Sequence, residues 1–168
     1  NYKIQRFNNQ IKEYYFDFCE YKKLKKLINY EKPDIIFHLA AQALVQKSFI
    51  YPIETFQSNT LGTLSILESI KNYNKKMQII FITSDKVYEN KEWEWGYRET
   101  DQLGGKDPYS LSKSFAEKLI YSNYKNFFES KKNIRIGIAR AGNVIGGGDW
   151  SENRIVPDCF KAYGNNKT

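Results

Sequence analysis

Three residues of this sequence have the types and spacing needed for acid–base chemistry: Tyr109, Lys113 and Ser84. Tyr109 and Lys113 lie four positions apart, a spacing that places both side chains on one face of a helix. A phenol has a pKa near ~10, and an adjacent ammonium group together with a cationic cofactor ring lowers it by ~3. The resulting tyrosinate can take a proton from a substrate hydroxyl that is hydrogen-bonded to Ser84. We therefore predict that Ser84, Tyr109 and Lys113 are catalytic.

A tyrosine and a lysine at this spacing also fit an ordinary amphipathic helix in which the tyrosine anchors the buried face. Two neighbours favour the catalytic interpretation. Ser84 directly follows the apolar run Met77–Thr83, which has the pattern of a buried strand. Pro108 precedes Tyr109, and proline is common in the first turn of a helix. In parallel sheets, ligands bind at the carboxyl ends of the strands, where Ser84 is expected to lie.

Strand and helix patterns alternate along the chain and supply the framework for these residues. The predicted strands are Tyr14–Phe18, Ile35–Ala40, Met77–Thr83 and Ile134–Ala139. The predicted helices are Tyr21–Tyr30, Ile53–Tyr73 and Pro108–Phe128. This alternation predicts an α/β fold, a doubly wound parallel sheet joined by right-handed crossovers. Near-continuous apolar runs such as Ile35–Ala40 are typical of strands that are buried on both faces.

The composition argues against several classes of protein. The chain has 168 residues, of which 41% are hydrophobic, and this suits one folded domain. Its net charge of +7 comes mostly from scattered lysines without a basic helix or zinc-finger pattern, so we predict no nucleic-acid partner. No apolar run approaches the ~20 residues that cross a bilayer, so we predict no membrane partner. One histidine and two distant cysteines, Cys19 and Cys159, predict reduced thiols in a cytoplasmic protein and no metal site.

Ordered motifs along almost the whole chain, from about Asp17 to Asp158, resemble those of the extended short-chain dehydrogenases/reductases. These motifs are His38-Leu39-Ala40-Ala41, Asn59, Thr83-Ser84-Asp85-Lys86-Val87-Tyr88, Tyr109-Ser110-Leu111-Ser112-Lys113 and Arg140-Ala141-Gly142-Asn143. The resemblance implies a Rossmann-type fold, NAD as the cofactor and a nucleotide sugar as the substrate.

The same resemblance implies two sets of binding residues. The cofactor set is Asp17 and Phe18 at the adenine, Leu39, Ala40, Ala41 and Asn59 along the rest of the cofactor, and Tyr109 and Lys113 at the nicotinamide ribose. The substrate set is Asn143 at the diphosphate, with Asp149, Trp150 and Arg154 where the family grips the nucleotide. His38 lies inside an apolar strand, and we interpret it as structural.

Asp85 and Lys86, directly after Ser84, resemble the corresponding residues of nucleotide-sugar 4,6-dehydratases. Epimerases of the family lack the acidic residue, whereas in the dehydratases it protonates the departing 6-hydroxyl. The next residue is usually a glutamate that removes the C5 proton, and the Asp-Lys pair instead resembles the enzymes that act on CDP-glucose. The Trp-rich stretch Glu89–Asp107 and the segment Gly142–Trp150 resemble that subgroup as well. CDP-glucose is therefore the predicted substrate.

The implied reaction is redox-neutral overall. Oxidation at C4 acidifies the C5 proton, water leaves across C5 and C6 with Asp85 as the acid, and hydride returns to C6. Lys86 is either the C5 base, if burial lowers its pKa, or a stabiliser of the enolate, and both interpretations stay open. The competing interpretations of the whole are a GDP-mannose or dTDP-glucose 4,6-dehydratase, a UDP-sugar epimerase, or a non-catalytic NAD-binding scaffold.

No G-x-G-x-x-G turn joins a strand to a helix, and the glycine run Gly146–Gly148 has the pattern of a loop. We therefore expect the chain to lack the first βαβ portion and most of the substrate-binding part, and to be inactive alone. Residues 1–145 are assigned to a partial NAD-binding domain and residues 146–168 to the start of a nucleotide-sugar binding region. Similar enzymes imply a homodimer formed by the helices Ile53–Tyr73 and Pro108–Phe128.

Overall fold

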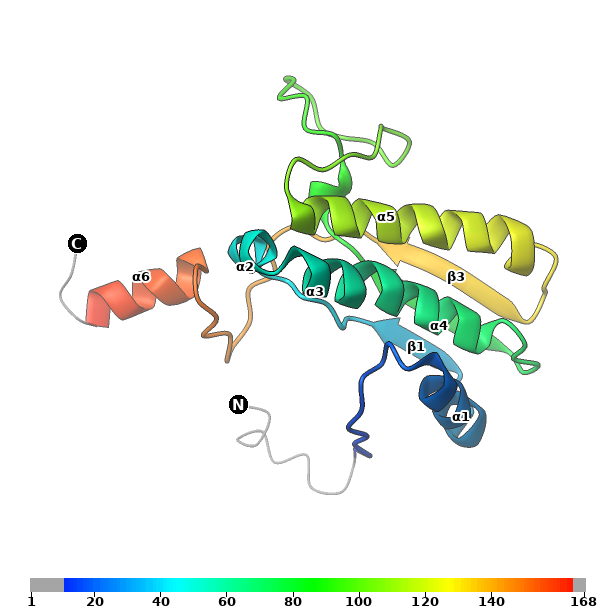
Figure 1. Ribbon diagram of the computed structural model, residues 1–168. Coiled ribbons are helices and arrows are strands. Elements are labelled where there is room, and N and C mark those ends of the chain that lie inside the picture. Colours follow the sequence, from blue (N-terminus) through cyan, green and yellow to red (C-terminus); the bar gives the residue numbers. More distant parts are fainter. Residues whose placement is uncertain (1–10, 165–168) are drawn as a thin grey trace. The chain divides into compact units, whose positions relative to one another are not determined.

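The structure is a computed structural model that describes residues 11–164 (Figure 1). The described chain divides into two compact units, which are treated separately below. The larger unit is Phe18–Gly142, and the smaller one combines residues 11–17 with residues 143–164. The division at residue 145 expected from the sequence remains a prediction.

The larger unit is built on a parallel sheet of three strands in the order β1-β2-β3. The strands are β1, Ile35–His38; β2, Met77–Ile82; and β3, Ile134–Ala139. Phe37 of β1 pairs with Ile80 of β2, which in turn pairs with Gly137 of β3. The predicted α/β fold with a parallel sheet is confirmed. The prediction of a strand at Tyr14–Phe18 is wrong, because this stretch has no strand pairing.

Helical segments fill the connections between the strands. They are α1, Tyr21–Glu31; α2, Val45–Ile50; α3, Pro52–Phe56; η2, Gln57–Leu61; α4, Gly62–Ile70; η3, Asp85–Val87; α5, Pro108–Asn123; η4, Tyr124–Phe128; and α6, Ile155–Gly164. The predicted helix Ile53–Tyr73 corresponds to α3, η2 and α4, in which η2 is a π-helical turn. Likewise, Pro108–Phe128 is helical throughout and ends in the π turn η4.

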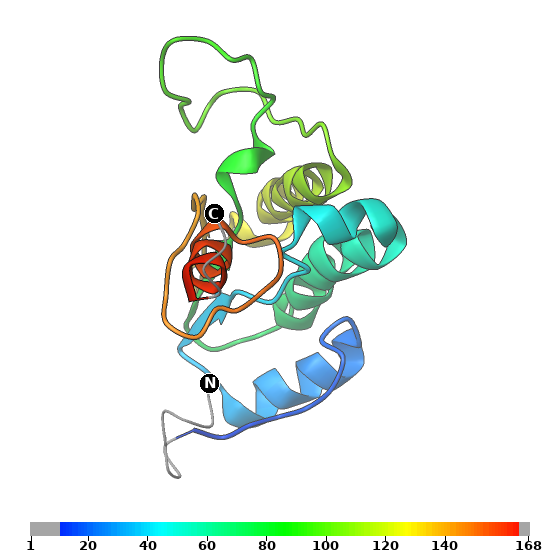
Figure 2. The same ribbon diagram turned by 90° about the vertical axis from the view of Figure 1, so that its left-hand side faces the viewer.

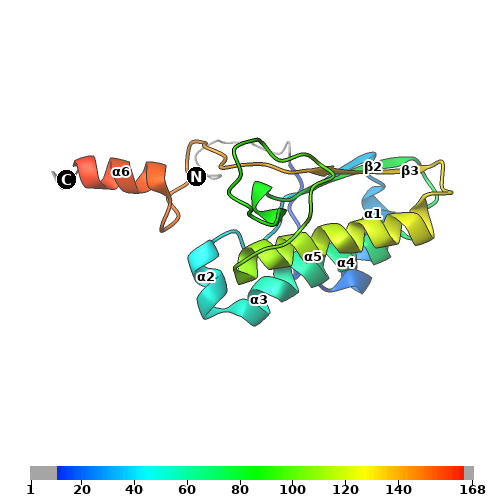
Figure 3. The same ribbon diagram turned by 90° about the horizontal axis from the view of Figure 1, so that it is seen from above.

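The hydrophobic core lies between one face of the sheet and helices α1, α4 and α5. Alternate residues of β2, Met77, Ile79 and Phe81, point to this core, because side chains of a strand alternate between its two faces. They meet Leu67 and Ile70 of α4, both fully buried. Figures 1 and 3 show α4 and α5 side by side across this face of the sheet.

The other face of the sheet is open in the described part of the chain. Phe37 of β1 is 59% exposed, and Ile35 on the same face is exposed as well. The prediction that this strand is buried on both faces is therefore wrong, because the helices α1, α4 and α5 pack on one side only. The apolar run that suggested burial on both faces is real, but half of its side chains lack a covering layer among the described residues.

The close packing of Gly62 against Phe18 gives a first testable prediction. A methyl group at Gly62, the first residue of α4, would lie 2.2 Å from Cε2 of the Phe18 ring. We expect Gly62→Ala to lower the free energy of unfolding of the full-length protein by ~1–3 kcal/mol, the usual cost of overpacking. This loss opposes the gain of about 0.5–1 kcal/mol that alanine normally brings to a helix. Urea unfolding followed by circular dichroism measures the difference.

Gly137→Ala is the matched control, because no atom of residues 11–164 lies within 4 Å of a methyl group at that position. The Gly62→Ala substitution should also cost less in a Phe18→Ala background, where the clashing ring is absent. If Gly62→Ala is as stable as the wild type in both backgrounds, the packing of Phe18 on α4 is wrong.

Candidate active site

The predicted catalytic serine lies where backbone pairing between β2 and β3 continues past the strand ends. The Thr83 N–H donates to the Ala139 carbonyl at 2.9 Å, and the Asp85 N–H donates to the Ala141 carbonyl at 3.0 Å. Ser84 stands between these two bonds and is buried. Both neighbours are thus bonded to the end of β3, Thr83 to its last residue and Asp85 to the segment that follows, and the sheet itself fixes the position of Ser84.

The 3-10 turn η3 begins directly after Ser84 and carries the two residues that distinguish the predicted reaction. The Ser84 hydroxyl accepts a hydrogen bond from the Lys86 N–H at 3.2 Å and donates one to Asp85 Oδ1 at 3.1 Å. Val87 is fully buried and anchors the turn, whereas Asp85 and Lys86 are exposed. Lys86 therefore lacks, in the described structure, the burial on which its role as a base depends.

Lys113 of α5 reaches the same strand end from the helical layer. Its Nζ donates to the carbonyl of Ile82, the last residue of β2, at 3.3 Å. The side chain is buried, and this burial lowers the pKa of Lys113 to about 8, although the charge of Glu117 opposes the change. A group with that pKa still carries its charge at pH 7 and can stabilise an anion beside it. The ammonium group of Lys113 is thus bonded to Ile82, which lies two residues before Ser84.

Tyr109 occupies the first turn of α5, and several groups fix that turn. Asp107 caps the helix by accepting from the Ser110 N–H at 2.9 Å, and Pro108 fills the first helical position. The Tyr109 N–H donates to the Ser48 hydroxyl of α2 at 3.1 Å. Tyr109 is itself buried, one helical turn before Lys113 on the same face. Ser48 is a positioning residue that the sequence did not reveal, because α2 was not predicted.

Asn59 ties the loop after β1 to helix α5. From the π turn η2, its side-chain carbonyl accepts from the Gln42 N–H at 2.8 Å. Its amide group donates to the Gln42 carbonyl at 3.0 Å and to the Ser112 hydroxyl at 2.9 Å. Asn59 is buried and both of its amide hydrogens are used within the protein. Its direct contact with a cofactor stays a prediction, while the contacts in the structure give it a positioning role for Leu39, Ala40 and Ala41.

His38 is enclosed by aromatic rings at the end of β1. The ring centroids of Phe18 and Phe81 lie 5.7 Å and 5.6 Å from that of His38. Burial, with a contribution from the charge of Lys113, lowers the pKa of His38 to about 4, so the ring is neutral at pH 7. In the unfolded chain His38 has its ordinary pKa of ~6.5, so between that pH and about 4 the unfolded chain binds a proton that the folded one does not. The free energy of unfolding therefore falls as the pH drops through this range. These surroundings support the structural interpretation of His38.

The predicted substrate residues lie in the smaller unit. Asp149 accepts from the Ser151 N–H at 3.0 Å, and this bond is the main cause of the lowered pKa of its carboxyl group. Arg154 Nε lies 3.9 Å from Asp149 Oδ2. Asn143 and Trp150 are exposed. These four residues belong to the smaller unit, and the catalytic residues belong to the larger one. That both sets bind the same substrate stays a prediction.

Asp17 also belongs to the smaller unit, whereas Phe18 opens the larger one. Asp17 is exposed, and the Phe18 ring packs between His38 and Gly62. Their place at the adenine stays a prediction.

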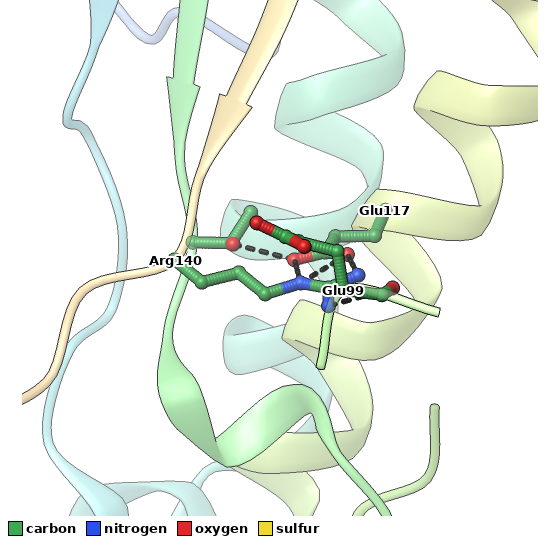
Figure 4. Close-up of polar contacts among 4 residues, drawn as sticks. Glu99, Glu117 and Arg140 are labelled. Atoms are coloured by element: carbon green, nitrogen blue, oxygen red, sulfur yellow. Dashed lines mark hydrogen bonds and ion pairs between the residues drawn. The ribbon is translucent and has the colours of Figure 1, made fainter. Parts of the chain in front are cut away.

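An ion pair that the sequence did not reveal lies beside the catalytic residues. Arg140, which directly follows β3, pairs with Glu117 of α5 through Nη2 and Oε2 at 2.7 Å (Figure 4). The only hint in the sequence was the position of Glu117, four residues after Lys113 on one helical face.

A loop of residues 88–107 extends from this end of the larger unit, away from its helices (Figure 2). Its aromatic rings form a continuous cluster, in which two of the three ring contacts are stacked and the third is tilted. Tyr88 stacks on Tyr97 with centroids 4.8 Å apart, and Trp93 lies 5.2 Å from Tyr97 and 5.3 Å from Trp95. The cluster gives this long loop a small hydrophobic centre of its own.

The described residues 11–164 contain no group of histidine, cysteine and acidic side chains that could hold a metal ion. Within the same residues, no helix is both long enough and apolar enough to span a bilayer.

Known proteins are similar to this chain in both sequence and fold. The family model described as GDP-mannose 4,6 dehydratase matches residues 1–141. The CDP-glucose 4,6-dehydratase of Salmonella typhimurium is 44% identical over 171 residues, which cover 99% of this chain and 47% of that protein. The chain thus spans about half the length of this curated relative.

Solved structures match at lower identity and therefore bear on the fold alone. The UDP-glucose 4-epimerase of Thermotoga maritima, solved with UDP-glucose, has a TM-score of 0.82 at 20% identity and covers 98% of this chain and 52% of that chain. The UDP-glucuronic acid 4-epimerase of Bacillus cereus, solved with UDP-glucuronic acid and NAD, has a TM-score of 0.81 at 24% identity. It covers 98% of this chain and 49% of that chain.

Proposed function

This chain belongs to the extended short-chain dehydrogenases/reductases, in the family described as GDP-mannose 4,6 dehydratase, and we propose that the full-length protein is a CDP-glucose 4,6-dehydratase. In this proposal it converts CDP-glucose to CDP-4-keto-6-deoxyglucose, a hydro-lyase reaction with an internal transfer of hydride. The substrate assignment draws on the 44% identity to the Salmonella typhimurium enzyme, which covers 99% of the chain.

The observation that carries the proposal is the turn η3 beside the buried Ser84. A serine at a strand end, with a tyrosine and lysine on the adjoining helix, suffices for oxidation of a hydroxyl. The turn adds an exposed carboxylate, Asp85, and an exposed ammonium group, Lys86, directly after that serine. Asp85 can protonate the departing hydroxyl and Lys86 can stabilise the negative charge that forms at C5, and both roles belong to an elimination of water.

The residues present fit NAD as the cofactor. Leu39 is 68% exposed and Ala40 is exposed, so a small and apolar surface is open at the carboxyl end of β1. Ligands of parallel α/β sheets bind at these strand ends. In the proposed complex Leu39, Ala40 and Ala41 line the cofactor, and Lys113 holds its nicotinamide ribose. When bound, NAD supplies a hydride acceptor for the first step and a hydride donor for the last.

The chain's own residues move the protons. Tyr109 takes the proton of the 4-hydroxyl as a phenolate, and the buried charge of Lys113 stabilises that phenolate. In the complex the Ser84 hydroxyl turns from Asp85 Oδ1 and donates its one hydrogen bond to the same sugar oxygen, which holds that oxygen in place. Ser84 and Asp85 are in contact in the structure. The oxidation site and the acid of the next step are therefore adjacent.

Elimination uses the turn η3. Asp85 gives a proton to the departing 6-hydroxyl. Lys86 is exposed and lacks the burial that a lysine base requires. We therefore assign it to stabilise the enolate and to position the basic group that accepts the C5 proton. Asn143, Asp149, Trp150 and Arg154 are proposed to hold the nucleotide and its diphosphate, where the charged Arg154 pairs with phosphate oxygens.

Parallel assays of the full-length protein test this function. CDP-, UDP-, GDP- and dTDP-glucose are each incubated with the protein and NAD, and the 4-keto-6-deoxy product is measured by mass spectrometry. The proposal expects the highest kcat/KM with CDP-glucose. Product from another nucleotide sugar alone, or epimerisation without loss of water, would contradict it.

We also propose that the full-length protein is a homodimer, joined through the helices that cover the sheet. Leu61 of η2 and Tyr121 of α5 are exposed apolar side chains on these helices, with exposed fractions of 50% and 65%. Because burial of such surface drives association, Leu61→Glu and Tyr121→Glu together should convert the dimer to a monomer. Light scattering at micromolar concentration measures the mass. Tyr30→Glu, an equally drastic change on α1, is the control, and a wild-type monomer would refute the dimer.

A further inference from the structure

The carboxylate of Glu117 is fully enclosed and fully bonded. The side chain is 2% exposed. Its Oε1 accepts from the Thr83 hydroxyl at 2.6 Å and from Arg140 Nε at 3.1 Å, while Oε2 accepts from Arg140 Nη2 at 2.7 Å. Figure 4 shows the guanidinium and the carboxylate lying edge to edge. Such a bidentate pair fixes the orientation of both groups more tightly than a single ion pair does.

Arg140 is held from its other side by the loop of residues 88–107. Its Nη1 donates to the Glu99 carbonyl at 3.1 Å, and its guanidinium carbon lies 4.6 Å from the centre of the Tyr88 ring. These contacts leave the arginine little freedom to swing away from Glu117. The pair therefore joins the end of β2, the end of β3, helix α5 and the aromatic loop.

Glu117 has a second possible partner in Lys113. The two residues are four positions apart on α5, which is the spacing at which opposite charges pair on a helix. The structure shows a different arrangement, in which Lys113 Nζ donates to the Ile82 carbonyl and Glu117 pairs with Arg140. The groups that act on Lys113 are thus His38 from β1, the Ile82 carbonyl from β2 and Glu117 from its own helix. Tyr109 lies one helical turn before Lys113 on the same face.

We propose that Arg140 is a positioning residue that holds the Glu117 carboxylate against Thr83 and so prevents it from pairing with Lys113. The ammonium group then remains available to Tyr109. This inference rests on the proposed function only in taking Tyr109 and Lys113 as the catalytic pair. Without Arg140, the buried carboxylate loses its main cation and Lys113 becomes its nearest replacement.

Titration of Lys113 tests the proposal without any substrate. The full-length protein is labelled with 13C-lysine, and the Lys113 signal is assigned by its loss in Lys113→Arg. In Arg140→Met the pKa of Lys113 should rise by ~1 or more, because an opposite charge now approaches it. In Glu117→Gln, which keeps the shape and removes the charge, it should fall. In the double variant it should return toward the wild-type value.

A pH profile extends the same test to catalysis. The acid limb of single-turnover NAD reduction with CDP-glucose should move to higher pH in Arg140→Met, because a paired Lys113 stabilises the Tyr109 phenolate less. It should move to lower pH in Glu117→Gln. A merely structural pair would lower the rate at every pH and leave the limb in place.

The outcomes separate this inference from the proposed function. An unchanged Lys113 titration in Arg140→Met overturns the inference whatever the substrate is. If Arg140→Met does not fold, Glu117→Gln decides by itself, since an unchanged or raised pKa of Lys113 there also overturns it. If Lys113 titrates as expected but the wild-type protein leaves CDP-glucose unchanged, the proposed function fails and the inference stands.

Discussion

Replacing Tyr109 with phenylalanine in the full-length protein is expected to lower the rate of sugar oxidation by ~10²–10⁴-fold, the usual cost of removing one general base. The change removes a single oxygen and keeps the ring, so the buried first turn of α5 should remain intact. The ring's neighbours in that turn are set by backbone and cap contacts, such as those of Asp107 and Ser48, which do not use the Tyr109 hydroxyl. Single-turnover reduction of NAD with CDP-glucose measures the effect.

NAD binding should survive in Tyr109→Phe, because Lys113 and the loop after β1 are unchanged. Isothermal titration calorimetry checks this separately from activity. Tyr121→Phe is the matched control, since it removes the same oxygen from an exposed tyrosine of the same helix. Activity of Tyr109→Phe within a few-fold of the wild type would remove Tyr109 from the catalytic set.

Asp85→Asn and Lys86→Ala are expected to block elimination while leaving the first oxidation in place. Asparagine keeps the shape of Asp85 but cannot give up the same proton, and alanine removes the charge that Lys86 brings to the enolate. Each variant should therefore still reduce NAD in a single turnover and then stop at the 4-keto-glucose stage. Overall turnover should fall by ~10²–10⁴-fold, as is typical when one acid or base is lost.

Exchange of the C5 hydrogen with deuterated water, followed alongside cofactor absorbance, locates the blocked step. Lys91→Ala is the control for Lys86→Ala, because Lys91 is another exposed lysine nearby and its ion pair is with Glu89. Wild-type exchange in Lys86→Ala would exclude Lys86 both as the base and as a stabiliser of the enolate, because either role speeds the loss of the C5 proton. Failure of either variant already at NAD reduction would contradict the division of labour between η3 and the Ser84–Tyr109–Lys113 set.

Much of the fold follows from local patterns in the sequence. The strand Ile134–Ala139 has the bounds predicted for it, because a short apolar run between polar residues has few alternatives. The helix that carries Tyr109 also begins at the predicted proline, where Asp107 supplies the cap. Ser84 follows the end of β2, and helix α5 begins on the same side of the sheet before it crosses over to β3. Lys113, near the start of that helix, therefore lies at the same strand end.

Other features depend on contacts between distant residues, which local patterns do not encode. Glu117 and Arg140 lie 23 residues apart, and their pairing depends on where α5 crosses β3. The strand predicted at Tyr14–Phe18 has suitable residue types, but none of the strands in the part of the chain that the structure describes pairs with it. The π turn at Asn59 is likewise set by tertiary contacts, since its amide bonds to Gln42 and Ser112 rather than following a helical repeat.

The aromatic cluster in the loop of residues 88–107 gives the protein a natural fluorescent reporter. Two of the three tryptophans in the sequence, Trp93 and Trp95, lie in that loop with their ring centroids 5.3 Å apart. The third, Trp150, belongs to the smaller unit, so Trp150→Phe leaves an emission spectrum that comes from the loop alone among the residues of this chain. Stacked indoles quench and shift each other's emission, and their signal therefore follows the ordering of the loop around Arg140. Rapid-mixing fluorescence can then test whether this loop changes on binding, independently of the chemistry at Ser84.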